Sequence, residues 1–416
     1  MLLFTTKSQV DCIFLYKKAV SMYSRQIYTT LKNHLSKKQI TVITGMRRVG
    51  KTTAIKYLLE QIPHDNKVYI DLERIENRHL FNQQSYVDIE RGLTQMGVKL
   101  TEKAVIALDE IQLVTNIPSV IKLLYDTYDI KFIVTGSSSY YLKNHFTESL
   151  AGRKRLFEMW PLNFKEYLLF KNVYKKQIEE EKLQTFLTSF YLLYKNHYED
   201  YIQWGGFPEV VLAEDEVDKK TYLLDVINAY IELDIKLLSD FSAVDTLYKL
   251  ILLLTNRTGS KVDFSKLSSI LGINRHIIKN YITLLEYTYF IRLVKPFSKG
   301  IDKALAKQPK LYFTDTGILN VLQKGLSSGH LFENMIAQQL SFLGQLNYYE
   351  KKSGAEIDFI LNAQKAFEVK ETPLLTDYNK LSRRSFSIGL NDFSLIGRYP
   401  TEAQKFNDFI WGGSIF

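Results

Sequence analysis

Short apolar runs alternate with helix-periodic segments in the first third of the chain. Residues 40–44, 105–108 and 131–134 are mainly apolar. Such runs are typical of strands that are buried on both faces of a parallel sheet. Apolar residues recur at helical spacing over 55–62, and Pro63 ends that pattern. This part of the chain is therefore predicted to be an α/β domain with a parallel sheet.

The middle of the chain is predominantly helical by the same criterion. Apolar residues recur at helical spacing across 155–245, and the glycines and proline of 204–208 mark a turn. Further on, the spacing predicts two short helices separated by Gly272, with Asn274 placed to cap the second one. A β-prone stretch follows over 289–294. This order of elements resembles a winged helix-turn-helix.

The last hundred residues combine one amphipathic helix with a pair of strands. The helix covers 329–344, with Glu333 near its start. The segment 355–361 alternates between apolar and polar residues as a strand does. The polar connection 362–365 suits a hairpin that leads to a second strand over 366–371.

Alternation assigns the charged side chains of this strand pair to faces. Glu356, Asp358 and Ile360 are expected to share one face of the first strand. Glu368 and Lys370 are expected to share one face of the second strand. Charges on a strand commonly mark a solvent-facing edge, but here they stand among apolar residues, and three acids group with one lysine. The grouping favours a functional site.

The segment between the first apolar run and the first helix matches the phosphate-binding pattern G-x-x-x-x-G-K-[ST] in full. Its glycines permit a close backbone approach, so that successive N–H groups can point at phosphates. Lys51 would reach the β and γ phosphates of ATP, and Thr52 would supply a hydroxyl to Mg²⁺. The residues expected to hold the nucleotide are Gly45, Arg48, Val49, Gly50, Lys51, Thr52 and Thr53.

Two acids follow the second apolar run at the distance that a P-loop nucleotide site requires. Asp109 is placed to hold Mg²⁺, and Glu110 could orient or deprotonate the attacking water. The alternative is that these carboxylates cap a helix or lie in a solvated turn. A complete P-loop earlier in the chain favours the nucleotide role.

Polar residues that follow the third apolar run are weaker candidates. Thr135, Gly136 and Ser137 could read the γ phosphate or the attacking water, but they also fit an ordinary turn-rich loop. Arg153 could reach the nucleotide of a neighbouring subunit and stabilise the charge that develops during transfer. It could equally be a solvated arginine.

Composition and charge narrow the class of protein. The chain has 416 residues, of which 46% are hydrophobic and 24% are charged, as in globular proteins of several domains. Its net charge of +9 weakly favours a nucleic-acid partner. The single cysteine excludes an intramolecular disulfide framework. We find no signal-peptide pattern and no apolar run of the roughly 18 to 20 residues that a membrane span needs, so we expect a cytoplasmic protein without membrane contact.

Several stretches resemble one known family over nearly the whole chain. They are GMRRVGKTT, IALDEIQ, IVTGSSS, LAGR, WPLNFKEY, WGGFPEVV and KLYFTDTGILNVL. Together they are similar to a prokaryotic family of AAA-superfamily ATPases with a C-terminal domain of unknown function. The resemblance implies the usual nucleotide roles for Lys51, Thr52, Asp109 and Glu110, and a trans-acting role for Arg153 in a homo-oligomer.

The C-terminal strand pair resembles the PD-(D/E)xK nuclease fold. Asp358 and Glu368, with Glu333, would hold a second divalent ion, Mg²⁺ or Mn²⁺, and Lys370 would position or activate water. Ile357 stands where the name-giving motif has a proline. A nuclease-like fold does not by itself imply cleavage.

Polar residues on the second helix of the helix-turn-helix are candidates for nucleic-acid contact, with DNA favoured. They are Arg275, His276, Lys279 and Asn280. A helix-turn-helix used for protein packing is the alternative.

These patterns predict an α/β chain of four parts. We expect a P-loop AAA-type ATPase domain over 1–154, a helical region over 155–245, a winged helix-turn-helix over 246–300 and a restriction-endonuclease-like domain over 301–416. The predicted function is ATP hydrolysis coupled to a nucleic-acid-handling module. The alternative is a nucleotide-gated switch whose C-terminal module binds a protein or DNA partner without cutting.

Overall fold

The computed structural model describes most of the chain. The described residues are 23–83, 85–136, 150, 152–175, 185–235, 241–298, 307–323, 325–351, 354–401 and 408–416.

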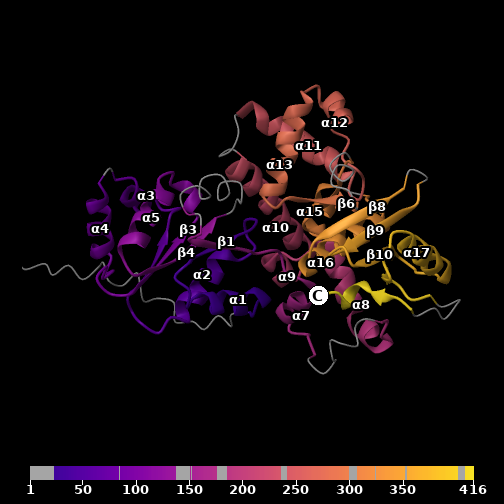
Figure 1. Cartoon of the computed structure of the whole chain (residues 1–416), viewed down its shortest axis with the longest axis horizontal. Coiled ribbons are helices and arrows are strands. Elements are labelled where there is room, and N and C mark those ends of the chain that lie inside the picture. Colours follow the sequence, from indigo (N-terminus) through magenta and orange to yellow (C-terminus); the bar gives the residue numbers. More distant parts are fainter. Residues whose placement is uncertain are drawn as a thin grey trace, which may run out of the picture.

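A five-stranded parallel sheet forms the amino-terminal part (Figure 1). Its strand order, β2-β3-β4-β1-β5, places the strand that leads into the phosphate-binding loop between two neighbours. The three strands expected from the apolar runs are confirmed as β1, β3 and β4. The strands are β1 (Ile40–Thr44), β2 (Lys67–Asp71), β3 (Ala104–Asp109), β4 (Ile130–Gly136) and β5 (Lys154–Glu158).

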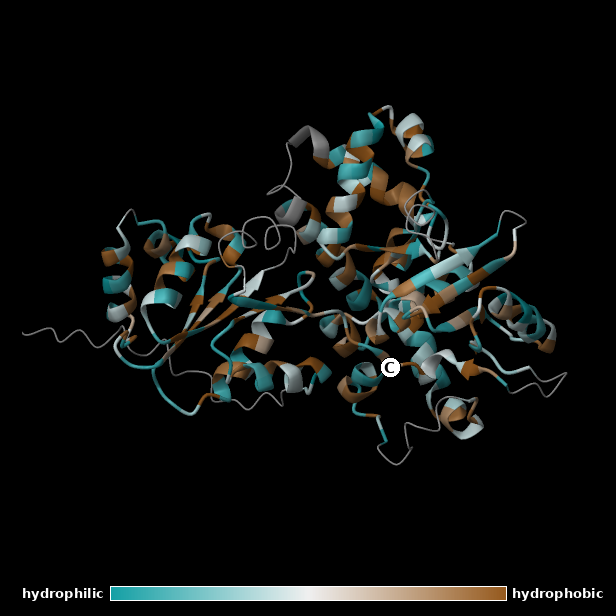
Figure 2. Ribbon diagram, in the orientation of Figure 1, coloured by the Kyte–Doolittle hydropathy of each residue, from teal (hydrophilic) through white to brown (hydrophobic). Residues whose placement is uncertain are grey.

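Helices cover both faces of this sheet. Figure 1 shows α1 and α2 on one side and α3 to α5 on the other, and Figure 2 shows brown, apolar strands between them. Successive side chains of β1 serve opposite faces, because Val42 packs under α3 to α5 whereas Ile43 packs under α1 and α2. The helices are α1 (Gln26–His34), α2 (Lys51–Glu60), α3 (Ile75–Phe81), α4 (Tyr86–Gln95) and α5 (Ile117–Thr127).

A helical region follows the first sheet. The two helices separated by Gly272 are confirmed: Gly272 ends the first in the left-handed conformation, with φ of 66°, and the Asn274 side chain caps the second. Within the described residues, no helix is both long and apolar enough to cross a membrane. The helices are α7 (Phe164–Phe170), α8 (Thr188–Trp204), α9 (Pro208–Leu212), α10 (Glu216–Ala229), α11 (Phe241–Thr255), α12 (Phe264–Leu271) and α13 (Arg275–Tyr287).

A seven-stranded mixed sheet forms the carboxyl-terminal part, in the order β12-β11-β10-β9-β8-β6-β7. Helix α16 packs on one face of this sheet, and α17 packs on the other face (Figure 1). In the chain, α17 connects β10 to β11, which pair in parallel. The helices are α15 (Thr316–Leu322), α16 (Ser328–Leu343) and α17 (Leu375–Ser387). The strands are β6 (Ile291–Pro296), β7 (Lys310–Phe313), β8 (Leu346–Glu350), β9 (Glu356–Leu361), β10 (Lys365–Lys370), β11 (Asp392–Gly397) and β12 (Ile410–Trp411).

The structure corrects the three domain boundaries expected from the sequence. The boundary at 154 cuts off β5, which pairs with β1 in the first sheet. The boundary at 245 falls inside α11. The boundary at 300 separates β6 from β7, although the two pair with each other and β6 also pairs with β8. Strand pairing between distant segments decides the first and third of these boundaries, and local periodicity does not report such pairing.

A buried carboxylate joins two turns that are far apart in the sequence. Asp315 is fully buried, and its side chain accepts hydrogen bonds from the backbone N–H groups of Gly206 at 2.8 Å and Ile318 at 3.1 Å. The carbonyl of Gly206 in turn accepts from the N–H of Leu162 at 2.7 Å. This contact ties the turn before α9 to the start of α15 and to the chain that leaves the first sheet.

We predict that Gly206→Ala destabilises the fold. A Cβ at this position would lie 2.3 Å from the carbonyl oxygen of Leu162, a backbone atom that cannot rotate away. Overpacking of this kind costs about 2 kcal/mol, so the melting temperature should fall by several degrees.

The matched control is Gly329→Ala in the first turn of α16. A Cβ there would meet its nearest atom, an oxygen of Glu371, at 3.7 Å, which is an ordinary contact. Thermal melting of both variants checks the prediction, and equal melting temperatures would contradict it.

Candidate functional site

The phosphate-binding loop is held by the chain that leaves β5. Gly45 has φ of 151°, and a Cβ on it would lie 2.0 Å from the carbonyl oxygen of Met159. Gly50, with φ of 100°, immediately precedes α2, which begins at Lys51. Both glycines are therefore required by conformation or by space, and the amino end of α2 points at the loop.

Lys51 lies buried against the same loop. Its amino group donates to the carbonyl oxygens of Gly45 at 2.9 Å and Met46 at 2.8 Å. The lysine charge is thus already positioned beside the backbone that would surround a phosphate group.

Asp109 receives hydroxyl groups from three different elements. Thr52 at the start of α2 donates to it at 2.7 Å, and Tyr69 of β2 donates at 2.8 Å. Thr135 of β4 also donates to the Asp109 carboxylate. Burial, and then the Asp109 carboxylate, raise the pKa of Tyr69 well above its ordinary value, so its hydroxyl remains a donor.

Glu110 follows Asp109 in a left-handed conformation, with φ of 56°. Its backbone N–H donates to the Thr135 hydroxyl at 3.1 Å, and its buried carboxylate accepts from the amide of Gln112. A non-glycine residue in this conformation is uncommon and is often found at functional sites.

Together these residues fit a magnesium nucleotide. A threonine hydroxyl and an aspartate carboxylate offer the hard oxygen atoms that Mg²⁺ prefers. Thr52 and Asp109 lie within hydrogen-bond distance of each other, beside the lysine and the loop. The carboxyl edge of the first sheet therefore brings together four of the residues expected from the sequence, namely Lys51, Thr52, Asp109 and Glu110.

The other residues expected to hold the nucleotide are more dispersed. Arg48 forms ion pairs with Glu209 at 3.7 Å and Asp225 at 3.5 Å, which belong to α9 and α10. The carbonyl of Val49 accepts from Arg25 at 3.0 Å. Thr53 is exposed on α2. Thr135 and Gly136 end β4, and Ser137 lies outside the described residues.

Arg153 lies at the opposite edge of the sheet from the phosphate-binding loop. Its carbonyl accepts from the N–H of Ile40, the first residue of β1, whereas the loop follows the last residue of that strand. Its side chain forms two hydrogen bonds with Asp126, at 3.0 and 3.1 Å. Within one chain Arg153 therefore does not face the nucleotide site, and the trans-acting role stays a prediction.

A second group of charged residues lies where β9 and β10 meet α16. The Asp358 carboxylate accepts from the backbone N–H of Val369 at 2.8 Å, and Lys370 donates to Glu368 at 3.0 Å. Glu333 of α16 accepts from the Tyr312 hydroxyl at 2.8 Å. An open cleft of about 260 Å³ runs past Glu333 and Lys370.

A bulge in β9 changes the strand faces expected from simple alternation. Asp358 and Phe359 together lie opposite the single residue Tyr348 of β8. As a result, Phe359 packs on the α16 side, whereas Ile357 and Ile360 share the cluster under α17. The expectation that Ile360 shares a face with Asp358 is wrong, because the extra residue resets the alternation.

The Glu368 carboxylate is paired with two cationic side chains rather than placed in a metal-binding site. Arg384 of α17 approaches its carboxylate at 3.4 Å, and Lys370 does so at 3.0 Å. Within the described part of the chain, no group of three or more His, Cys, Asp or Glu side chains is arranged to hold a metal ion. The expected three-acid site of Glu333, Asp358 and Glu368 is therefore not formed in this conformation.

Electrostatic coupling nevertheless links these acids. Burial, and then the Asp358 carboxylate, raise the pKa of Glu333 and of Glu368 above the ordinary carboxyl range. Both groups thus resist ionisation where they stand, because burial and a neighbouring carboxylate disfavour the charged form.

Sequence reasoning missed several residues that complete the two groups. Tyr69 donates a hydrogen bond to Asp109, and Gln112 donates one to Glu110. Gln112 lies only two residues beyond Glu110, so the sequence alone showed that the two are close. Lys310 forms an ion pair with Glu356, and Arg384 reaches Glu368. Tyr69, Lys310 and Arg384 reach their acidic partners only because β2, β7 and α17 fold beside them. Local sequence therefore carried no signal for these three residues.

The candidate nucleic-acid residues of α13 lie on the surface. Arg275, His276, Lys279 and Asn280 are all exposed, whereas Ile278 of the same helix is buried. The outward orientation expected from the helical spacing is confirmed.

Fold and site together define a P-loop NTPase domain of the AAA class. A family described as an AAA domain matches residues 37–168, and a family described as a domain of unknown function (DUF8612) matches residues 195–328. Uncharacterized protein MJ1637 of Methanocaldococcus jannaschii is 30% identical over 355 residues, which cover 78% of this chain and 73% of that protein. The chain therefore belongs to the same protein family as MJ1637 and carries an AAA domain.

Two further comparisons complete the picture. An uncharacterized protein of Haemophilus influenzae is 29% identical over 357 residues, which cover 81% of this chain and 85% of that protein. Among solved structures, the Aeropyrum pernix ORC1 protein in complex with DNA is similar at 9% identity, with 72% of this chain and 91% of that chain covered. Its TM-score of 0.33 is too low to carry a structural argument.

We predict that the two buried glutamates make stability fall as pH rises. Their folded pKa, about 7 for each, exceeds the unfolded carboxyl value, so the folded state binds the extra protons. Their contribution to stability is fully present below the unfolded carboxyl pKa and is lost as pH rises through about 7. Glu333→Gln with Glu368→Gln should flatten this part of the profile.

The measurement is the urea unfolding midpoint between pH 5 and pH 8. Glu214→Gln, at an exposed position after α9, is the control and should retain the slope of the parent protein. If the double variant has the same dependence of stability on pH as the parent protein, Glu333 and Glu368 are not the cause of that dependence.

Proposed function

We propose that the protein is an ATPase that binds Mg-ATP at the carboxyl edge of its first sheet and couples the nucleotide state to a nucleic-acid-handling C-terminal module. The observation that carries the proposal is the contact between Thr52 and Asp109, at 2.7 Å, beside Lys51 and Glu110. A P-loop, a metal-binding hydroxyl and two acids in this arrangement serve phosphoryl transfer to water.

Each residue of this site has a chemical task in the proposal. Bound Mg²⁺ would supply charge neutralisation at the phosphates, and Thr52 and Asp109 are the residues that would hold it. Lys51 would exchange its two carbonyl partners for phosphate oxygens. Glu110, released from Gln112, would orient and deprotonate the attacking water, while Thr135 keeps the backbone at Glu110 in place. Arg153 would act on the nucleotide of a neighbouring subunit.

Contacts of the phosphate-binding loop support coupling to the rest of the chain. Arg48 pairs with Glu209 and Asp225, and the sulfur of Met46 accepts a hydrogen bond from the Thr314 hydroxyl at 3.7 Å. Thr314 directly follows β7 of the second sheet. A phosphate group that draws Lys51 or Arg48 toward itself would therefore change contacts with α9, α10 and the second sheet.

The order of elements supports a nuclease-like C-terminal module. Helix α16 is followed by the meander β8-β9-β10, and α17 then crosses to β11, which pairs parallel with β10. In this proposal, Asp358 on β9 and the Glu368-x-Lys370 pair on β10 would supply the acids and the lysine of the PD-(D/E)xK motif. Metal-dependent cleavage would require Glu368 to leave Arg384.

Helices α12 and α13 and the hairpin of β6 and β7 support a winged helix-turn-helix. The four polar side chains at the start of α13 are exposed, and Figure 1 shows this helix group projecting from the body of the molecule. Such a position leaves α13 free to approach a DNA groove.

A second candidate function is a nucleotide-gated switch whose C-terminal module binds without cutting. Two observations favour it: Glu368 is paired with Lys370 and Arg384, and no three-acid metal site is formed among the described residues. In this function the same acids would serve stability or partner contact.

We predict that Lys51→Ala abolishes nucleotide binding and that Glu110→Gln retains binding while lowering turnover by at least about 100-fold. Lys51→Ala removes the positive charge beside the phosphates, whereas Glu110→Gln removes only the carboxylate that would deprotonate the attacking water. Equilibrium binding and phosphate release measure the two effects. Lys32→Ala, at an exposed position near the end of α1, is the control. Unchanged turnover in both site variants would overturn the ATPase proposal.

The two candidate functions predict different outcomes with DNA. Under both, Arg275→Ala with Lys279→Ala should weaken binding and reduce its salt dependence by about two phosphate contacts, whereas Lys220→Ala on α10 should not. A nuclease should cut DNA with Mg²⁺ or Mn²⁺, and Asp358→Ala should abolish cutting while DNA binding remains. Binding without cutting, by the parent protein with or without ATP, would favour the switch. Unchanged binding by the α13 variant would oppose a DNA role for that helix.

A further inference from the structure

The amino end of β7 places a buried lysine in the second group of acids. Lys310 is 7% exposed, and its amino group forms an ion pair with the Glu356 carboxylate of β9. Two residues further along β7, on the same face of the strand, Tyr312 donates to Glu333 of α16 at 2.8 Å. One strand therefore supplies both a cation and a hydroxyl donor to acids that belong to two other elements.

The surrounding acids keep the amino group of Lys310 charged. Burial alone would lower the pKa of Lys310, but Glu333, Asp358 and Glu356 raise it above its ordinary value. A lysine is almost never buried unless such partners are present. Lys310 is therefore a permanent cation within this group of acids at neutral pH.

Pairing on both edges of β7 fixes the position of this cation. Lys310 pairs with Val294 of β6 on one edge. On the other edge lies the segment 259–262, where the N–H of Gly259 donates to the carbonyl of Leu311 at 2.8 Å. This segment connects α11 to α12 of the helix-turn-helix. The backbone at Lys310 therefore cannot withdraw from the acids unless one of these pairings breaks.

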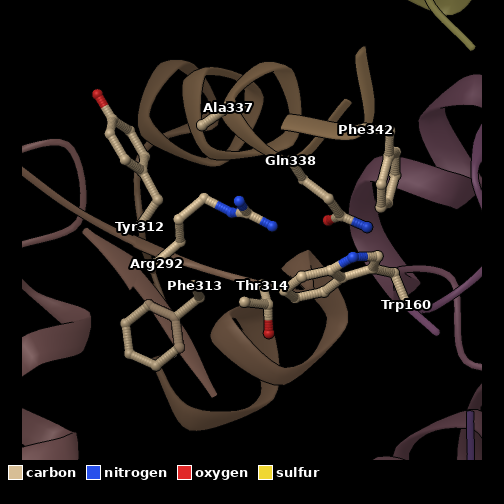
Figure 3. A pocket seen from close by; sticks show the side chains of 8 residues that line it. All are labelled: Trp160, Arg292, Tyr312, Phe313, Thr314, Ala337, Gln338 and Phe342. Atoms are coloured by element: carbon tan, nitrogen blue, oxygen red, sulfur yellow. The ribbon is translucent and has the colours of Figure 1, made fainter. Parts of the chain in front are cut away.

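The other end of β7 reaches the phosphate-binding loop. Figure 3 shows this end at the junction of Trp160 with Gln338 and Phe342, around a cavity of about 10 Å³. Thr314, which directly follows β7 and lines this cavity, donates to the sulfur of Met46 in the loop at 3.7 Å. A single strand thus extends from a contact with the loop to the second group of acids.

Cations of the protein itself already lie beside the acids at which a divalent ion would bind. Lys310 pairs with Glu356, and Lys370 pairs with Glu368. The open cleft is lined by Glu333 and Lys370 but not by Lys310, so Lys310 approaches the acids from the protein interior. A positive charge at such a position lowers the attraction of the acids for a second cation. In the described conformation these residues therefore do not fit a resident metal ion.

We propose that Lys310 is a built-in counter-ion that takes the place of a divalent metal ion in the acidic group of Glu333, Glu356 and Asp358. The inference rests on the proposed nuclease-like C-terminal module and adds how its acids are regulated. The group stays closed to metal as long as β7 holds Lys310 in it. The phosphate-binding loop and the segment 259–262 both contact β7, so nucleotide binding and partner binding are the two events that would move Lys310.

The decisive variant is Lys310→Met, which keeps the length of the side chain and removes its charge. The acids then lack their interior cation and should bind Mn²⁺ at least about 10-fold more tightly than in the parent protein. Mn²⁺ should also raise the melting temperature of the variant more than that of the parent, because an ion that binds only the folded state stabilises it. Titration calorimetry and the electron paramagnetic resonance of free Mn²⁺ measure binding to the nucleotide-free proteins.

Three further variants assign the effect to Lys310 and to this group of acids. Asp358→Asn, added to Lys310→Met, should abolish the new ion site, which separates it from any Mn²⁺ held at Asp109. Lys310→Arg keeps the charge and should behave as the parent protein does. Lys365→Met is the matched control, because it removes a lysine that pairs with Asp392 at 3.2 Å elsewhere on the same sheet, and it should create no ion site.

Two results would overturn the inference. One is Mn²⁺ binding to the parent protein that depends on Asp358 and is as tight as in Lys310→Met. The other is a folded Lys310→Met variant that gains no ion site. If Lys310→Met is unfolded without metal, its circular dichroism in about 1 mM MnCl₂ decides the question: recovery of the fold supports the inference, and no recovery counts against it, since the ion should replace the missing charge.

These outcomes are separate from those of the proposed function. A parent protein that binds no ATP would overturn the ATPase proposal, but it would leave the Mn²⁺ comparison intact because that comparison uses no nucleotide. A parent that neither binds nor cuts DNA would remove the nucleic-acid role in the same way. Conversely, equal Mn²⁺ affinity in the parent and in Lys310→Met would overturn the role of Lys310 alone.

Discussion

The close approach of Met159 to Gly45 constrains both the phosphate-binding loop and the chain that follows β5. The N–H of Met159 donates to the carbonyl of Thr44 at 2.7 Å, and its own carbonyl occupies the space where a side chain on Gly45 would stand. Met159 follows the last strand of the first sheet and leads directly into the helical region. The phosphate-binding loop and the chain that leaves the first domain are therefore one packed unit, and neither can shift without the other.

Polar contacts extend this unit toward the rest of the molecule. Arg25 is buried between the loop, Trp160 and Glu166, with which it forms an ion pair at 3.0 Å. Breaking a buried pair of this kind usually costs several kcal/mol, since one charge is left without a partner. The exposed pairs of Arg48 are weaker by comparison. The loop is therefore held by a strong buried contact at Arg25 and by weaker exposed contacts at Arg48.

The two groups of acids differ in how their charge is balanced. Asp109 is surrounded by hydroxyl donors from Thr52, Tyr69 and Thr135, which support a carboxylate without neutralising it and leave it able to attract a cation. Glu368 instead has a lysine and an arginine as partners. Among the described contacts, the first carboxylate is therefore surrounded by neutral donors, whereas Glu368 is paired with cations of the protein itself.

The sequence by itself determined the local features. The P-loop, the strands before it and before Asp109, and the caps of α12 and α13 are each encoded within a few neighbouring residues, so spacing and turn chemistry were sufficient. Tertiary structure decided what depends on pairing between distant segments. The fifth strand of the first sheet, the sheet shared by β6 and β7, the bulge at Asp358, and the junction of Trp160 with Gln338 and Phe342 all follow from such pairing. Periodicity along the chain reports which face of an element is apolar, but it does not report which other element covers that face.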